Sequence, residues 1–505
     1  MMKATLRSAV LLGIAALGMG LASIPSFAEV QNVKVGGEVN VRAFLRKSLR
    51  LSEDVFNGVG AGSTSVVGTA TGAGSDFGSA EDNFLQQLTA VNIGADLTEN
   101  SSAEIRLINQ RVWGGFGSDA IDPATSVTDA NRVDLSLANV TLKELFYSPL
   151  TVTLGRQRLW FGRGFIVGSR LMRGDIDPGQ NLGADEFSDL TAFDAIRGTL
   201  DLAGVAGGVP LLVNAVYAKV DENDISISSD TDSTADDVNL VGVNLGTRAD
   251  QWNSELEAYY WNKRDNDLAL TSPGTMENNP QSNTMGVRGS ASPMEGTSLW
   301  GELAAQWGNR LTSGIAFDAE GAAGDDYQAW AANLGLDYAA SGAPWSPTVG
   351  GEWIFYAGDE GNATAIAGWE PVFRGAFTTL IREFQAAGFY VPAQSGATVG
   401  GAFNNITNSV TNQHQLALHA MVKPIEDLSL DNRLTWFIAD NGIVPVAGAK
   451  RESFFGTEWD VNANYHYTDD VQMGLVYGVF WPGSVFRSPY DDIAQELVTS
   501  VSVKF

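Results

Sequence analysis

The sequence contains no cysteine, which excludes disulfide bonds and thiolate metal sites. It has only three histidines, so few imidazoles are at hand for catalysis or metal binding. After the first thirty residues, no stretch approaches the ~20 consecutive apolar residues that a membrane-spanning helix needs. No GxxxxGK[ST] motif for nucleotide phosphates occurs. Lysine is scarce, and the excess of acidic residues gives a formal net charge of −28.

Glycine and aromatic residues are abundant instead, with 56 glycines and 13 tryptophans. The mean hydropathy is −0.04. In a membrane β-barrel, lipid-facing and lumen-facing residues alternate, so their hydropathies cancel in any window average. A hydropathy near zero together with this composition favours a membrane barrel.

The first residues have the pattern of a secretory signal peptide. Lys3 and Arg7 form a positive start, an apolar run covers 9–22, and Ser26-Phe27-Ala28 is a small-x-small cleavage site. The run is too short for a membrane anchor, and a buried N-terminal helix fits the pattern less well. We therefore expect residues 1–28 to be a signal peptide and 29–505 to be one domain.

The rest of the chain shows a period of two. In the first segment Val33, Val35 and Val39 share one face, and Lys34 and Glu38 share the other. A strand places alternate residues on one side, whereas a helix would scatter them around its surface. We predict about eighteen such strands, near 33–46, 84–97, 101–113, 132–147, 151–161, 192–202, 210–220, 237–248, 252–264, 283–291, 297–310, 326–340, 347–358, 411–423, 427–439, 455–467, 471–481 and 496–505.

Short and long connections alternate between these strands. Tight turns such as 98–100, 148–150 and 468–470 are rich in Asp, Asn, Pro and Gly, while links such as 47–83 and 359–410 are long. Outer-membrane barrels have short periplasmic turns and long extracellular loops. The fold class predicted is therefore all-β, a single transmembrane antiparallel barrel in the bacterial outer membrane.

The end of the chain agrees with this prediction. The last segment alternates apolar and polar residues and finishes on Phe505. Such an ending resembles the terminal strand that the barrel-insertion machinery receives, so we expect that machinery, together with outer-membrane lipid and lipopolysaccharide, among the partners. A closed barrel leaves no unpaired strand edge in lipid.

The polar face of each strand should look into a water-filled lumen, because a barrel of this width is too large for side chains to fill. Arginine on the lipid side would cost roughly 2–4 kcal/mol at the bilayer midplane. Alternation therefore places arginines in the lumen, where each either pairs with a wall carboxylate or meets the solute. The candidate pore-lining residues are Arg42, Arg46, Arg106, Arg156, Gln157, Arg158, Arg163, Arg197, Arg248, Arg288, Arg433, Glu458 and Asp460.

The fifth strand does not fit the alternation well. Val152 and Leu154 share the parity of Arg156 and Arg158, so a bulge at Gly155 would be needed to exchange the faces. The residues after the strand begin a loop with two early glycines, and this loop is expected to fold back into the pore.

Several ordered motifs resemble the alginate-export porins. "LGRQRLWFGRGFIVGSR" (154–170) followed by "TAFDAIRGTL" (191–200) is similar to that family's Gly-Arg-Gln strand, glycine turn and Phe-Asp-x-x-Arg strand. "GEWIFYAGDEGN" (351–362) resembles its Gly-Asp segment before a long loop. "FGTEWDVNANYHYTDDVQMGLVYGVFWPG" (455–483) resembles its Gly-x-Glu-x-Asp strand, turn and Phe-x-Pro-Gly strand.

The resemblance implies an eighteen-stranded porin with an electropositive constriction that passes polyuronate. By motif, Arg156, Gln157, Arg158 and Arg197 would line or brace the pore, as would the pair Glu458 and Asp460. The sequence departs from the family's founding exporter at 468–470, where a long periplasmic turn is replaced by a short one.

The leading hypothesis is a channel for passive diffusion of anionic solutes, including acidic oligo- or polysaccharide such as alginate. A general porin and a surface protein with acidic loops, such as 221–237, are the alternatives. An outer-membrane hydrolase would need His414, His419 or His466 as its base. We expect no enzyme activity, no cofactor, no metal and no nucleic acid, and a monomer.

Overall fold

A computed structural model describes residues 32–49, 51, 81–113, 133–170, 189–205, 207–221, 238–265, 281–310, 325–358, 368–383, 411–443, 450–487 and 491–505. The predicted signal peptide, the tip of the acidic loop 221–237 and most of the long links lie outside these residues. Within them, no helix is long and apolar enough to cross a membrane.

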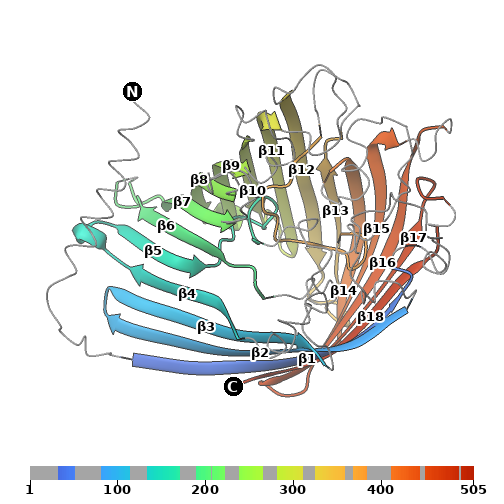
Figure 1. Ribbon diagram of the computed structural model, residues 1–505, viewed down its shortest axis with the longest axis horizontal. Coiled ribbons are helices and arrows are strands. Elements are labelled where there is room, and N and C mark those ends of the chain that lie inside the picture. The colour runs from blue at the N-terminus through green and yellow to red at the C-terminus, as the bar shows by residue number, and fades with distance from the viewer. Residues whose placement is uncertain are drawn as a thin grey trace, which may run out of the picture.

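Eighteen antiparallel strands form one sheet, as the alternation predicted (Figure 1). They are β1 (Asn32–Lys47), β2 (Glu81–Thr98), β3 (Ser101–Val112), β4 (Asp134–Leu142), β5 (Leu150–Gln157), β6 (Phe193–Asp201), β7 (Leu211–Asp221), β8 (Val238–Ala249), β9 (Ser254–Asp265), β10 (Gln281–Ala291), β11 (Thr297–Arg310), β12 (Asp325–Ala339), β13 (Thr348–Tyr356), β14 (Gln413–Ile425), β15 (Leu428–Ile443), β16 (Glu452–His466), β17 (Val471–Pro482) and β18 (Ala494–Lys504). The predicted fourth strand, 132–147, was too long, because Phe146 and Tyr147 take positive φ angles and belong to a turn.

The sheet closes on itself. β1 pairs with β2 along one edge and with β18 along the other, so the first and last strands are neighbours. Gly37 and Phe505 exchange two backbone hydrogen bonds of 2.7 and 3.0 Å, which fixes the end of the chain against β1. Because the sheet is closed, each strand has a neighbour on both sides. The backbone N–H and C=O groups of the strands therefore have hydrogen-bond partners within the protein, which they need in the absence of water.

Short and long connections alternate around the barrel, as predicted. The short ones are tight turns, two of them with single 3-10 turns at Leu145–Tyr147 and Gln251–Asn253. Both chain ends of the barrel lie on the short-turn side, which we call the periplasmic end by the rule for outer-membrane barrels.

The two faces of the wall differ in polarity. Val35, Val243 and Leu418 are examples of the apolar side chains exposed on the outer face. Glu302, Asn333 and Gln415 point inward and are buried. The buried apolar clusters also lie inside the barrel, where segments between strands pack against the wall.

Gly155 in β5 has a backbone conformation and a close neighbour that would not accommodate a side chain. Its φ is +108°, and a Cβ at this position would lie 2.3 Å from the carbonyl oxygen of Ala138 in β4. Gly155→Ala is therefore expected to destabilise the barrel by at least about 1 kcal/mol, because the positive φ strains any side chain. The folded band on a gel should disappear at a lower temperature than in the wild type.

Gly94→Ala is the matched control, because Gly94 also lies in a strand and no heavy atom stands within 4 Å of the position of its Cβ. Equal heat resistance of the Gly155 and Gly94 variants would contradict the strain at Gly155.

Candidate functional site

Two segments that link neighbouring strands run inside the barrel and meet there. Residues 158–170 follow β5, and 368–383 lie between β13 and β14 (Figure 1). They form a parallel bridge between Val167 and Phe373. The N–H of Gly168 donates to the carbonyl of Phe373 (2.7 Å), and the N–H of Phe373 donates to Ile166 (2.9 Å). The predicted return of the first loop into the pore is thus present.

A row of glycines allows this close approach. A Cβ on Gly168 would lie 2.9 Å from Cα of Gly375, and a Cβ on Gly375 would lie 2.5 Å from the carbonyl carbon of Gly168. Apolar side chains of both segments, such as Phe165 and Trp369, pack against the wall. The two segments therefore form one rigid constriction rather than separate loops.

The second segment, here called the strap (368–383), is anchored at both ends. At its start, the N–H of Glu370 donates to the side chain of Gln306 in β11 (3.0 Å), and Gln306 donates back to the Glu370 carbonyl (2.7 Å). At its end, the two carboxylate oxygens of Glu458 in β16 accept the backbone N–H groups of Ile381 and Arg382, the latter at 2.8 Å. The strap is therefore held to the inner side of the wall at β11 and at β16.

Charged side chains fix the end of the strap internally. Glu383 accepts hydrogen bonds from Thr379 N–H (3.0 Å) and from Gln415 in β14 (3.0 Å), and pairs with Arg374 at 2.7 Å. Burial alone would raise the pKa of the Glu383 carboxyl, but Arg374 and these donors hold it below its ordinary value. Burial lowers the pKa of Arg382 to about 10, so both groups are charged at neutral pH.

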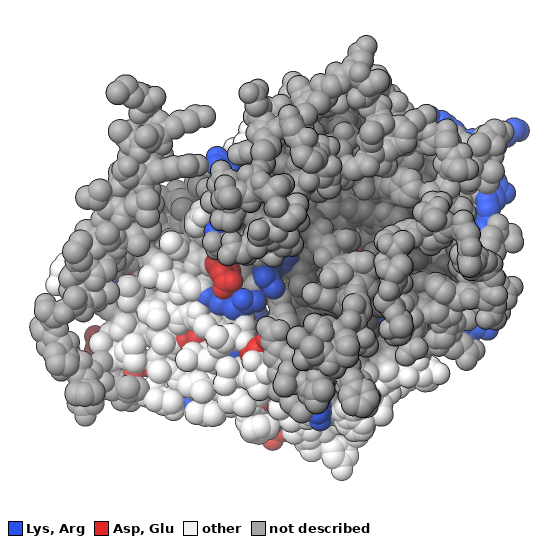
Figure 2. All heavy atoms as spheres, in the orientation of Figure 1, with Lys and Arg blue, Asp and Glu red and all other residues white. Residues whose placement is uncertain are grey.

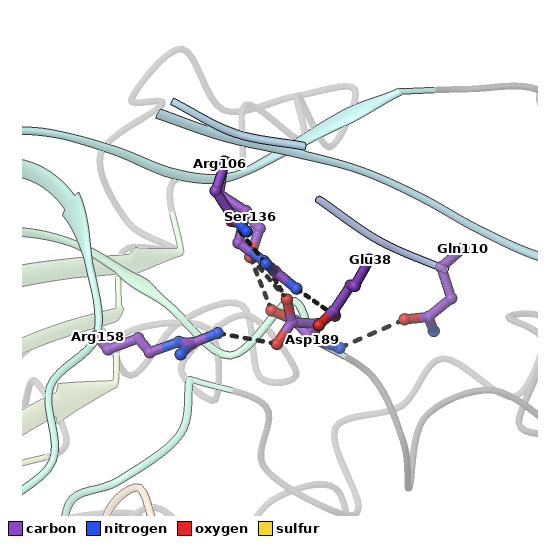
Figure 3. A network of polar contacts seen from close by, with 7 residues as sticks. Glu38, Arg106, Gln110, Ser136, Arg158 and Asp189 are labelled. Carbon is purple, nitrogen blue, oxygen red and sulfur yellow. Dashed lines mark hydrogen bonds and ion pairs between the residues drawn. The ribbon is translucent and has the colours of Figure 1, made fainter. Parts of the chain in front are cut away.

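A second charged network lies near the β3 wall (Figure 3). Arg106 in β3 donates to Glu38 in β1 (2.7 Å) and to Asp189 (2.6 Å). Arg158 reaches the other oxygen of Asp189 at 3.0 Å, and Ser136 donates to the Asp189 carbonyl at 3.0 Å. Asp189 comes just before β6 and had not been identified from the sequence. In Figure 2, basic and acidic atoms lie side by side in the hollow of this face.

Most of the other predicted lumen arginines also pair with wall carboxylates. The pairs are Arg46 with Glu496 (2.6 Å), Arg248 with Glu255 (2.9 Å), Arg288 with Glu257 (2.6 Å) and Arg433 with Glu352 (2.6 Å). Arg42 donates to the side chain of Gln86 at 3.0 Å. These pairs bridge neighbouring or nearby strands and brace the wall.

Among the predicted lumen residues, Arg163 and Arg197 have no carboxylate within ion-pair distance in the described part of the chain. Arg163 stacks its guanidinium over the indole of Trp300, 4.1 Å from the ring centroid. Arg197 donates twice to the side-chain oxygen of Asn214, at 2.8 and 3.1 Å, and lies over the ring of Phe161. Arg163 belongs to the inward segment 158–170, and Arg197 contacts that segment at Phe161.

The expectation for Arg156 requires correction. Arg156 pairs with Asp194 at 3.2 Å, and Asp194 shares the outer face with the exposed Ile196. The strand register continues through Gly155 without a shift on either side, so the faces are not exchanged. Arg156 therefore lies on the outer face with Leu154. Gln157 points inward, where its amide donates to the Ala195 carbonyl at 2.9 Å.

In the two inward segments, the exposed charged side chains are both arginines, whereas the buried ones carry both signs of charge. The side chain of Arg158 is 55% exposed, and Arg163 is exposed as well. The side chains of Glu352 and Glu383 are 4% and 0% exposed. Glu458 and Asp460 are also buried, on the lumen side of β16 near the end of the strap. Asp189 is partly exposed, but two arginines already contact it.

A hydrolytic or metal site receives little support. His419 contacts Asp337 at 2.6 Å, and His414 lies on the outer face beside Asp440. Among the described residues, no group of three or more His, Asp or Glu side chains is arranged to hold a metal ion.

Sequence reasoning missed the residues of the strap. Arg374, Arg382 and Glu383 lie in the link 359–410, of which the sequence analysis established only that it is long. Their irregular backbone carries no strand periodicity, so only the link's length pointed to them.

The sequence model of the alginate-export family matches residues 72–499. No curated protein sequence matches the chain. Among solved structures, OccK9 (OpdG) of Pseudomonas aeruginosa is 12% identical with a TM-score of 0.50, over 94% of this chain and 99% of that one. OccK8 (OprE) of the same organism is 10% identical with a TM-score of 0.50, over 94% and 98%. The outer membrane protein OpdK, also from P. aeruginosa, is 12% identical with a TM-score of 0.48, over 94% and 99%.

Removing the anchor of the strap should widen the channel. Glu458→Gln keeps the shape but replaces the charged acceptor of two N–H groups, each worth about 1.5–3 kcal/mol. We expect larger and noisier single-channel conductance in a planar bilayer. Glu255→Gln is the control, because Glu255 contacts Arg248 and Arg288 and not the strap. Unchanged conductance of the Glu458 variant would mean that this carboxylate does not hold the strap.

Proposed function

The chain belongs to the alginate-export family of outer-membrane channels, and from that premise we propose that it lets anionic solutes, including acidic oligosaccharide, diffuse passively through its lumen. Family and fold place it in the bacterial outer membrane.

The observation that carries the proposal is that the exposed charged side chains of the two inward segments, Arg158 and Arg163, are both cations. Glu352, Glu383 and Glu458 are buried, and each accepts hydrogen bonds from arginine or from backbone N–H groups. Arg158 and Arg163 remain exposed. A solute at the constriction therefore meets guanidinium groups first, even though the whole chain is acidic.

A cavity of about 240 Å³ beside the strap supports the proposal. Arg163, Glu352 and Arg374 are among its lining residues. Arg163 is exposed at this cavity, whereas Arg374 is buried beside it. A guanidinium group that solvent reaches can bind a carboxylate with charge-assisted hydrogen bonds.

The passage of a charged sugar would use a series of weak sites. Arg163 lies over the buried indole of Trp300, and Arg197 lies over the ring of Phe161, so aromatic side chains position both guanidinium groups. Several sites of modest affinity allow a solute to enter and still to leave. We also infer that the channel works as a monomer, since one barrel encloses a complete lumen.

A weakly selective general porin is the second candidate, because most lumen arginines are paired with carboxylates. The reversal potential across a KCl gradient distinguishes the two candidates. A clear preference for chloride supports the anion channel, and no preference supports the general porin. A preference for potassium would overturn the proposal.

Neutralising Arg163 should reduce the preference for chloride. A unit charge at ~4 Å in water contributes about 1 kcal/mol, so Arg163→Gln should lower the local anion concentration about fivefold. The same variant should weaken the block of current by added oligouronate. Arg248→Gln is the control, since Arg248 lies at the periplasmic end and pairs with Glu255. Equal selectivity of the Arg163 variant and the wild type would remove Arg163 from the pathway.

A further inference from the structure

Only three residues of the two inward segments are exposed. They are Arg158, Trp160 and Arg163, all in 158–170, whereas no residue of the strap is exposed. Two of the three are the cations on which the proposed function depends. The third is a large aromatic residue with 51% of its surface exposed. An apolar side chain of this size, left open at a water-filled constriction, is not explained by charge.

The indole of Trp160 is seated against three glycines. A Cβ on Gly164 would lie 2.5 Å from its Cζ2 atom, one on Gly375 would lie 2.8 Å from Cζ3, and one on Gly168 would lie 3.0 Å from Cε3. These atoms are spread around the six-membered ring, so a side chain at any of the three positions would displace it. Because Gly168 and Gly375 belong to different segments, the indole covers the place where the two segments meet.

The polar edge of the indole is directed into the protein. Its Nε1–H donates to the carbonyl of Gly162 at 3.2 Å. The turn 161–164, closed by the N–H of Gly164 on the carbonyl of Phe161 (2.9 Å), holds this acceptor in place. Since an indole has only this one donor, the exposed part of the side chain is apolar carbon. Trp160 therefore offers a flat apolar surface to a solute in the lumen.

Exposed guanidinium groups lie before and after this surface in the chain. Arg158 contacts Asp189 through Nη2 at 3.0 Å, as Figure 3 shows, and its side chain is still 55% exposed. Arg163 is held over the indole of Trp300. Because consecutive Cα atoms are 3.8 Å apart, the Cα atoms of both arginines lie within about 11 Å of that of Trp160. A solute of a few sugar units on the indole therefore reaches a cation.

A pyranose acid has the chemistry that matches this arrangement. One face of a pyranose ring consists of C–H groups, whose slightly positive hydrogens meet the negative face of an aromatic ring. The carboxylate of a sugar acid lies at the edge of the ring, where a guanidinium group binds it with charge-assisted hydrogen bonds. An acyclic carboxylate has the charge but not the apolar face. Arginine alone attracts both kinds of anion, whereas the indole distinguishes them.

We propose that Trp160 is a specificity-determining residue of the constriction, on which one ring of a pyranose acid stacks while Arg158 and Arg163 bind the carboxylates beside it. This inference rests on the anion channel proposed above and narrows its solutes from anions in general to acidic sugars. The arginines select by charge, and the indole selects by the shape of the ring. Stacking on one side only keeps the site weak, so that the solute also leaves.

Block of the ion current through the full-length protein in a planar bilayer tests the proposal. The probes are trigalacturonate and propane-1,2,3-tricarboxylate, which carries the same number of carboxylates without a ring. The wild type should be half-blocked by the sugar acid at a lower concentration than by the acyclic acid. Trp160→Leu should raise this concentration about fivefold for the sugar acid and leave it unchanged for the acyclic acid. Trp160→Phe should stay within about twofold of the wild type, because it keeps an aromatic face.

Trp345→Leu is the matched control, since Trp345 is an exposed tryptophan in the turn 340–347 at the periplasmic end. Heat-dependent gel mobility checks that each variant is folded. If trigalacturonate does not block the wild type at a lower concentration than the acyclic acid, the proposal is overturned without any variant. An unchanged response of Trp160→Leu to trigalacturonate would overturn it as well. Equal losses for both probes would also do so, because the indole would then act through the arginines and not on the ring.

The reversal potential across a KCl gradient is measured separately on the same preparations. Any of these negative results together with a preference for chloride removes only the role of Trp160. A preference for potassium in the wild type overturns the anion channel itself. The two failures are therefore distinguishable.

Discussion

The structure depends on one constraint, which is that every backbone N–H and C=O in the membrane needs a partner within the protein. Pairing of β1 with β18 meets it by closing the sheet, and the bonds between Gly37 and Phe505 complete the last contact. Closure at eighteen strands encloses a space too wide for wall side chains to fill. The polar side chains on the inner face of the strands therefore contact either water or other parts of the protein. The segments 158–170 and 368–383 are such parts.

Bringing irregular chain into the lumen changes the electrostatics there. An irregular segment has N–H groups that no strand accepts, and carboxylates are strong acceptors for them. Glu458 binds two such groups of the strap, and Glu383 binds others while pairing with Arg374. These acids are buried as a result. On the function proposed above, an acidic chain presents a basic constriction, because several of its lumen carboxylates are used for structure and some of its arginines are not.

The strands were predictable because a period of two over eight or more residues is a local signal. The alternation of short and long links was predictable as well. The return of 158–170 followed from its early glycines. The strap was not predictable in detail, because Glu458 and Ile381 are far apart in sequence and no periodicity relates them. The face of Arg156 was also open, since a glycine with positive φ is compatible with a bulge or with an unbroken register. Only the pairing with Asp194 decides between them.

The arginine-rich stretch from Arg156 to Arg163 now has a physical explanation. Arg156 and Arg158 would share a face if the strand continued, but β5 ends at Gln157. Alternation therefore governs Arg156, which stays with Leu154 on the outer face, and no longer governs Arg158, which turns inward to Asp189. The end of a strand thus lets one short run of sequence supply cations to both sides of the wall. A strand longer by two residues would place both arginines on the lipid side and would remove one exposed cation from the lumen.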